Sequence, residues 1–189
     1  MPKRSSRPSP RQRPVPTRWN RNSPVTLPPT SSEPVAAPVG PNGCDWYPHA
    51  TVASIVARDG RLLLVEERID GRLVLNQPAG HLEAGETLLE AAVRETREET
   101  GWDIHLESFI GVYQWTAPGG QHYLRFAFAG QPLAHDPARP LDTGIERALW
   151  LTPAELREET ARHRSPLVWQ VVADWLGGRR QPLSLVQSL

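Results

Sequence analysis

The feature that most constrains this chain is a helical pattern with marked ends between residues 80 and 102. Thr87 and Glu90 have the spacing of a capping box at a helix start, and Gly101 lies where a helix commonly ends in a left-handed residue. The preceding segment 78–85 contains one proline and two glycines, which favours a tight loop. The sequence therefore predicts a loop, a helix and a second loop, in this order.

Three glutamates share one side of the predicted helix. At 100° per residue, Glu95, Glu98 and Glu99 fall within an arc of about 100°. Like charges this close destabilise a helix unless a positive group lies among them, and a hard divalent cation prefers such oxygen ligands. The alternative is a solvated helix with the ion pairs Glu90–Arg94 and Arg94–Glu98. The residues expected to face the core are Leu89, Val93, Thr96 and Thr100.

The acidic residues belong to a longer pattern of fixed spacing. Its positions are Gly80, Glu86, Arg94, Glu95, Glu98, Glu99, Gly101 and the apolar Trp102. This pattern resembles the signature of Nudix hydrolases, enzymes that cleave nucleoside diphosphates linked to another group. The position of Thr96 usually holds a bulky aliphatic residue in that signature, and this departure concerns packing rather than chemistry.

The resemblance implies a metal-dependent hydrolysis of phosphoanhydride bonds. Mg²⁺ is the implied cofactor, and Mn²⁺ is a possible substitute. Glu95 and Glu99 are the implied metal ligands, with the Gly80 carbonyl as a further ligand. Glu98 is either another ligand or the base that receives the proton of the attacking water.

The roles of the remaining polar residues are less tightly fixed by the sequence. Arg94 is expected to orient a glutamate by hydrogen bonding, with Glu86 as its partner; the alternative is an exposed i,i+4 ion pair. Glu146 is an alternative base, or simply a charged residue on a strand surface. Three further candidates could bind substrate or serve packing and salt bridges, namely Arg125, Trp115 and Arg164.

Several stretches, one of which overlaps the signature, also resemble one phosphatase subgroup of the family. They are NQPAGHLEAGETL, YQWTAP, LRF and RSPLV. The subgroup implies removal of phosphate from nucleoside tri- and diphosphates and, further, action on hydroxymethylpyrimidine pyrophosphate. Leu75 stands where this subgroup is expected to have tryptophan, which leaves the base preference open. The alternatives are an ADP-ribose or dinucleotide pyrophosphatase and, without catalysis, a nucleotide-sensing or interaction module.

Strand and helix patterns predict an α/β (α+β) fold. Strands are expected at 50–57, 61–68, 72–75, 104–115, 123–129 and 145–151, with turns at Asp59-Gly60 and Asp70-Gly71 and a proline-interrupted loop at 132–140. Further helices are expected to start at Thr152-Pro153 and Ser165-Pro166. These elements indicate a mixed sheet with helices on both faces, and the resemblance implies the Nudix αβα sandwich.

Composition divides the chain into three parts. Residues 1–46 are rich in Pro, Arg and Ser and are predicted to be a disordered extension, 47–183 the Nudix domain, and 184–189 a short tail. The chain has 21 basic and 21 acidic residues, of which 1–44 hold seven basic and one acidic, so the rest carries 14 − 20 = −6. This balance argues against a specific nucleic-acid partner. The family resemblance implies a small phosphorylated metabolite or nucleotide as the partner.

The number of cysteines and the hydropathy of the sequence indicate the cellular location of the protein. Cys44 is the single cysteine, so no intrachain disulfide forms, and no apolar run approaches the ~20 residues that span a bilayer. We therefore expect a cytoplasmic location without a membrane contact. The sequence leaves a monomer and a dimer equally open.

Overall fold

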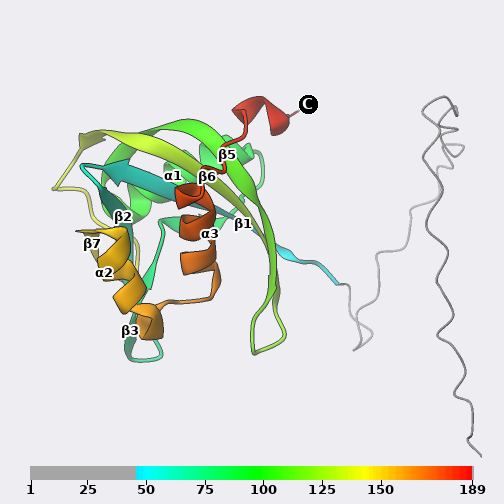
Figure 1. Ribbon diagram of the computed structural model, residues 1–189. Coiled ribbons are helices and arrows are strands. Elements are labelled where there is room, and N and C mark those ends of the chain that lie inside the picture. Colours follow the sequence, from blue (N-terminus) through cyan, green and yellow to red (C-terminus); the bar gives the residue numbers. More distant parts are fainter. Residues whose placement is uncertain (1–45, 189) are drawn as a thin grey trace, which may run out of the picture. The chain divides into compact units, whose positions relative to one another are not determined.

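A computed structural model describes residues 46–188, so the predicted extension 1–46 lies outside the described part except for Trp46 (Figure 1). The strands are β1 (His49–Arg58), β2 (Arg61–Ile69), β3 (Arg72–Asn76), β4 (Ala79–His81), β5 (Trp102–Thr116), β6 (His122–His135) and β7 (Ile145–Leu151). The α-helices are α1 (Leu88–Thr100), α2 (Pro153–Glu158) and α3 (Leu167–Leu176), and short 3-10 helices are η1 (Thr160–Arg162) and η2 (Leu183–Leu185).

The strands form a mixed sheet in the order β3-β2-β1-β6-β5, with β4 paired to β1 and β7 paired to β2. Only β1 and β6 are parallel, and the other pairs are antiparallel. The β1–β2 turn has positive φ at Asp59 (51°) and Gly60 (73°), as the Asp-Gly signal predicts. Because β1 pairs with β2 only next to this turn, the earlier part of β1 is free to pair with β4, which brings Gly80 into the sheet.

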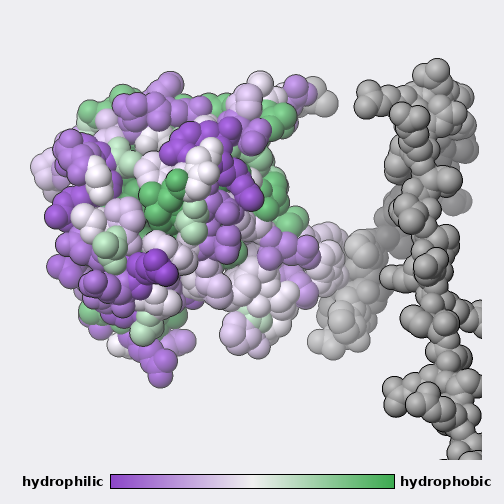
Figure 2. Space-filling model, in the orientation of Figure 1, coloured by the Kyte–Doolittle hydropathy of each residue, from purple (hydrophilic) through white to green (hydrophobic). Residues whose placement is uncertain are grey.

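Helices cover both faces of the sheet, which confirms the αβα prediction. Alternate residues of β1 face opposite cores: Val52 and Val56 pack with Ala91 and Ala92 of α1. The other face packs against α2 and α3, through Ile55, Leu64, Leu156, Val168 and Val171. Figure 2 shows hydrophilic residues over most of the surface that carries α2 and α3, which fits helices whose apolar sides face the sheet.

The structure departs from the predicted elements in three places. Strand β4 was not predicted, because three residues give no periodicity to read. Strand β6 continues through Pro132 to His135, where a loop was expected; Pro132 lies opposite Ile104 beside a register shift, where the ladder tolerates a missing N–H. Helix α3 begins after Pro166 without the expected side-chain cap from Ser165.

The C-terminal residues pack on the α1 side of the sheet. Leu183 and Val186 contact the core next to α1, and Gln181 exchanges backbone hydrogen bonds with Phe109 of β5. Val186 belongs to the predicted short tail, so this part of the tail contributes to the domain core. None of the helices within residues 46–188 has the length and apolar character needed to cross a bilayer.

Candidate active site

Two glutamates of helix α1 point toward the protein interior. Glu95 is 8% exposed and Glu99 is 7% exposed, because β4 and β1 lie beside this part of the helix. Thr96 and Thr100 are buried as predicted, and the other residues expected on the core side, Leu89 and Val93, pack against the core only partly. The side of the helix that carries the carboxylates is therefore more deeply buried than the sequence pattern indicates.

The Glu99 carboxylate is fixed by strand β4, which precedes the loop before α1. The Ala79 N–H donates a hydrogen bond to Glu99 Oε2 at 2.8 Å. Burial, together with the neighbouring acids Glu67 and Glu95, raises the pKa of Glu99 to about 9, although the hydrogen bond from Ala79 opposes this change. A buried carboxylate with so few donors is a suitable ligand for a cation, which would restore its charged form.

Gly80 has no side chain because the Glu95 carboxylate occupies that space. A Cβ placed on Gly80 would overlap the carboxylate carbon and both oxygens of Glu95. Burial raises the pKa of Glu95, and the hydrogen bond from Arg94 opposes this change. The glycine of the signature therefore makes room for the glutamate.

The guanidinium group of Arg94 donates hydrogen bonds to four residues. Its Nε and Nη2 donate to the two oxygens of Glu86 at 2.9 and 2.7 Å, and this pairing lowers the pKa of Glu86. Its Nη1 donates to Glu95 and to Glu98, each at 2.9 Å, and Nη2 also donates to the His81 carbonyl at 3.0 Å. The Arg94 side chain is 23% exposed, so the network is not a loose surface ion pair.

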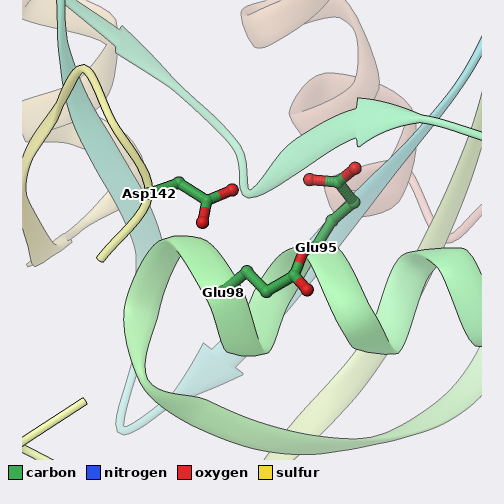
Figure 3. A group of neighbouring side chains, drawn as sticks. All are labelled: Glu95, Glu98 and Asp142. Atoms are coloured by element: carbon green, nitrogen blue, oxygen red, sulfur yellow. The ribbon is translucent and has the colours of Figure 1, made fainter. Parts of the chain in front are cut away.

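A loop distant in the sequence adds the carboxylate of Asp142 to those of the α1 glutamates. Single oxygens of Glu95, Glu98 and Asp142 lie within 4.8 Å of one another (Figure 3). Asp142 comes from the loop between β6 and β7, and its N–H donates to the Glu98 carbonyl at 3.2 Å. Hard oxygen donors converging in this way fit a divalent cation such as Mg²⁺. Sequence reasoning missed Asp142, because a lone loop aspartate carries no periodic or spacing signal.

Of the α1 glutamates, Glu95 and Glu99 line a cavity of about 520 Å³. Its other acidic lining residues are Glu67 and Glu83, and its remaining polar and aromatic lining includes Trp115, Tyr123, Asn76, Arg125 and Arg164. The rings of Trp115 and Tyr123 stack with centroids 5.6 Å apart across β5 and β6. The structure thus brings all three predicted substrate-binding candidates into the same cavity as Glu95 and Glu99.

The two arginines of the cavity have different partners. Arg125 is 8% exposed, its Nη1 donates to Asn76 Oδ1 at 3.4 Å, and burial lowers its pKa to about 10. Arg164 Nη1 donates to the buried carboxylate of Glu67. Glu67 was not among the predicted site residues, because a glutamate near the end of a strand usually indicates a surface position.

Glu146 lies apart from this arrangement. It is an exposed residue of β7 that is not part of the cavity lining, and Arg68 Nε donates to its carboxylate at 2.6 Å. The structure therefore does not place this candidate base beside the glutamates of α1.

Comparison with known proteins identifies the family to which this chain belongs. The NUDIX domain model matches residues 47–170. The chain belongs to the Nudix family. It is 43% identical to Phosphatase NudJ of Escherichia coli (strain K12) over 141 residues, 75% of this chain and 92% of that protein, and the Shigella flexneri NudJ gives the same values.

Solved structures agree with this assignment. A NUDIX hydrolase from Nitrosomonas europaea is 47% identical and superimposes with a TM-score of 0.74 over 76% of this chain and 98% of that chain. A UDP-X diphosphatase, at 18% identity and a TM-score of 0.59, shares the fold. The Nudix signature and these relatives together make the protein a hydrolase of phosphoric anhydrides.

Proposed function

We propose that this Nudix hydrolase is a Mg²⁺-dependent phosphatase that removes phosphate from nucleoside tri- and diphosphates. The observation that carries the proposal is the convergence of Glu95, Glu98 and Asp142 beside a cavity with basic and aromatic residues. The substrate class is supported by the 43% identity to Phosphatase NudJ across 92% of that protein. Hydroxymethylpyrimidine pyrophosphate is a further substrate under this proposal.

The carboxylates of α1 and Asp142 would hold the metal. Glu95, Glu98 and Asp142 supply converging oxygens, and Glu99 and the Gly80 carbonyl are the further ligands. Mg²⁺, or Mn²⁺ in its place, neutralises phosphate charge and makes a bound water more acidic when it occupies such a site. Arg94 keeps Glu95 and Glu98 at fixed positions, so little reorganisation is needed during the reaction.

We assign Glu98 as the residue that receives the proton from the attacking water. Among the glutamates that accept a hydrogen bond from Arg94, its side chain is the most exposed, at 38% against 10% for Glu95 and 15% for Glu86. An exposed carboxylate next to a metal site can exchange a proton with solvent after each turnover. Glu146 is the alternative base, and it would have to leave Arg68 first.

The remaining cavity residues would bind the rest of the substrate. Trp115 lies beside Tyr123 on the cavity wall and offers an aromatic face for a base or pyrimidine ring. Arg125 offers positive charge and Arg164 offers N–H donors for phosphate oxygens. The partner is therefore a small phosphorylated metabolite, and the single cysteine suits a reducing cytoplasm.

The test is phosphate release from a substrate panel, with Mg²⁺ or with EDTA. The panel holds nucleoside di- and triphosphates, hydroxymethylpyrimidine pyrophosphate, ADP-ribose and dinucleoside polyphosphates, and the products are identified. Wild type is compared with Glu98→Gln, with Glu146→Gln and with Glu158→Gln, an exposed helix residue away from the cavity. We expect wild type to release orthophosphate from the nucleotides with Mg²⁺ and not with EDTA. Among the three variants, we expect only Glu98→Gln to lose this activity.

Each other outcome has a definite meaning. Turnover restricted to ADP-ribose or dinucleotides would replace the phosphatase proposal by a pyrophosphatase. Metal-dependent turnover that survives Glu98→Gln but not Glu146→Gln would move the base to Glu146. If the folded protein binds nucleotides and hydrolyses none of the panel, a nucleotide-sensing module would replace the enzyme.

A further inference from the structure

Two adjacent glutamates of β2 have different surroundings. Glu66 is 4% exposed and Glu67 is 6% exposed. Glu66 accepts hydrogen bonds from Arg147 and Arg162 and is not part of the cavity lining. Glu67 lines the cavity together with Arg164. The pairing of β2 with β7 shifts register between Glu66 and Glu67, and only the Glu67 carboxylate lines the cavity, where it can act on a bound substrate.

Glu67 neutralises one of the two arginines of the cavity. Arg164 Nη1 donates to Glu67 Oε2, while Glu67 Oε1 is buried and has no hydrogen-bond partner among residues 46–188. The Arg164 side chain is 44% exposed, so the pair joins a buried carboxylate to a guanidinium at the cavity surface. The pair contributes no net charge to the cavity.

Arg125 is left as the cation without a carboxylate partner. Within the described part of the chain it forms no ion pair within 4.0 Å, and its hydrogen bond goes to the neutral amide of Asn76. Burial lowers the pKa of Arg125, the charge of Arg164 lowers it further, and the charges of Glu67 and Glu99 oppose this. The charges of Glu67, Arg125 and Arg164 therefore act on one another across the cavity.

We propose that Glu67 is a specificity-determining residue that limits how many phosphate charges the cavity accepts. By neutralising Arg164, it leaves one uncompensated arginine, Arg125, to balance the phosphates that the metal site does not. Without Glu67, both arginines would attract phosphate, and a substrate with one more phosphate would gain most. This inference rests on the proposed function, because it assumes that phosphates enter this cavity.

The test is a double-mutant cycle on the Glu67–Arg164 pair. The net charge of the pair is zero in wild type, +1 in Glu67→Gln, −1 in Arg164→Gln and zero in the double variant. The quantity compared is kcat/KM for a nucleoside triphosphate divided by kcat/KM for the diphosphate of the same base. A single charge in a partly solvated cavity should change this ratio by about fivefold at low salt.

We expect the ratio to rise about fivefold in Glu67→Gln, to fall about fivefold in Arg164→Gln, and to return to the wild-type value in the double variant. The change should lie mainly in KM, and 0.5 M salt should reduce it. Glu66→Gln is the matched control, because it removes the neighbouring buried charge outside the cavity. Its ratio should stay within about twofold of wild type.

Binding measured by calorimetry in EDTA gives a readout that does not depend on turnover. The dissociation constant of the diphosphate divided by that of the triphosphate should follow the same order across the four proteins. If binding follows this order across the four proteins but wild type hydrolyses neither nucleotide, the proposed function fails and the inference stands. If Glu67→Gln does not fold, the exposed Arg164→Gln variant still has to show the fivefold fall.

A common loss for both nucleotides in every variant, without recovery in the double variant, would overturn the proposal and make the pair purely structural. An equal shift of the ratio in Glu66→Gln would overturn it as well, because the effect would then be general to charge on β2.

Discussion

Helices α1 and α3 cover opposite faces of the same sheet, yet they bury different side chains. The buried residues of α3 are Leu167, Val168, Val171 and Val172. The buried residues of α1 are Ala91, Ala92, Glu95, Thr96, Glu99 and Thr100. Apolar burial stabilises the fold, whereas burial of a carboxylate costs free energy unless it is paired or binds a metal. The apolar burial of α3 therefore stabilises the domain, whereas the carboxylates that α1 presents to the cavity lower its stability.

The ends of the two helices show the same division. Thr87 and Glu90 form both hydrogen bonds of a capping box on α1, and Gly101 ends the helix with φ of 70°. Helix α3 has no side-chain cap at its start. Caps are worth about 1 kcal/mol, so the capping box gives α1 a local stabilisation that opposes the cost of its buried carboxylates.

The largest expected effect is the loss of activity in Glu99→Gln. We predict that kcat with Mg²⁺ falls roughly 10³-fold, because the buried oxygen ligand loses its charge. In EDTA the free energy of unfolding should stay the same or rise, since the amide has no charge to desolvate. Steady-state kinetics and urea unfolding measure the two effects. A large loss of stability in this variant would contradict the division between the helices.

Val171→Ala in α3 should give the reverse result. Val171 is fully buried in the core on the α3 side. Removal of two methyl groups should lower the free energy of unfolding by about 2 kcal/mol. At a temperature where the variant remains folded, kcat/KM should stay within about twofold of wild type. A tenfold loss of kcat/KM in the folded variant would show that the α3 core also controls the site.

Gly80→Ala should have a smaller effect, and one confined to the site. The added methyl group must displace the Glu95 carboxylate, which Arg94 holds in place, so we expect kcat/KM to fall about tenfold. Gly111→Ala is the control, because a Cβ there meets only the Tyr113 ring at 3.6 Å, an ordinary contact. Steady-state kinetics and thermal unfolding of both variants check this. Equal losses in the two variants would show that the effect is not due to Glu95.

Local sequence signals predicted the parts of the site that lie within one turn or one helix. The capping residues, the left-handed Gly101 and strand β7 all lie where the sequence places them. The Arg94–Glu86 contact was also predicted, because a helix and a short loop fix the separation of the two residues. The Arg94–Glu98 contact belonged to the alternative of a solvated helix with i,i+4 ion pairs, and the structure has it as well.

The residues that the sequence did not reveal reach the site through the tertiary fold. Asp142 arrives on a loop that a backbone hydrogen bond ties to Glu98, and Glu67 arrives through the pairing of β2 in the sheet. The burial of Glu95 and Glu99 depends on β4, whose three residues give no signal of their own. Contacts between distant segments are set by packing, which periodicity along one segment does not describe.

The central claim is that the buried carboxylates of α1 destabilise the metal-free protein and that a divalent cation removes this cost. The ordinary pKa of Glu99 is 4.5, and burial raises it to about 9 in the folded state. Between these values the folded protein keeps a proton that the unfolded chain has released. Stability is therefore greatest below pH 4.5 for this group and falls as pH rises toward 9. The raised pKa of Glu95 acts in the same direction.

The most direct measurement is the free energy of unfolding of wild type and Glu99→Gln from pH 5 to pH 9, with EDTA or with Mg²⁺. We predict that wild type in EDTA loses stability relative to Glu99→Gln as pH rises. Mg²⁺ should stabilise wild type most at high pH and Glu99→Gln little, because a ligand that binds only the folded state shifts the equilibrium toward it. Parallel pH profiles for the two proteins, with no stabilisation by Mg²⁺, would contradict the account.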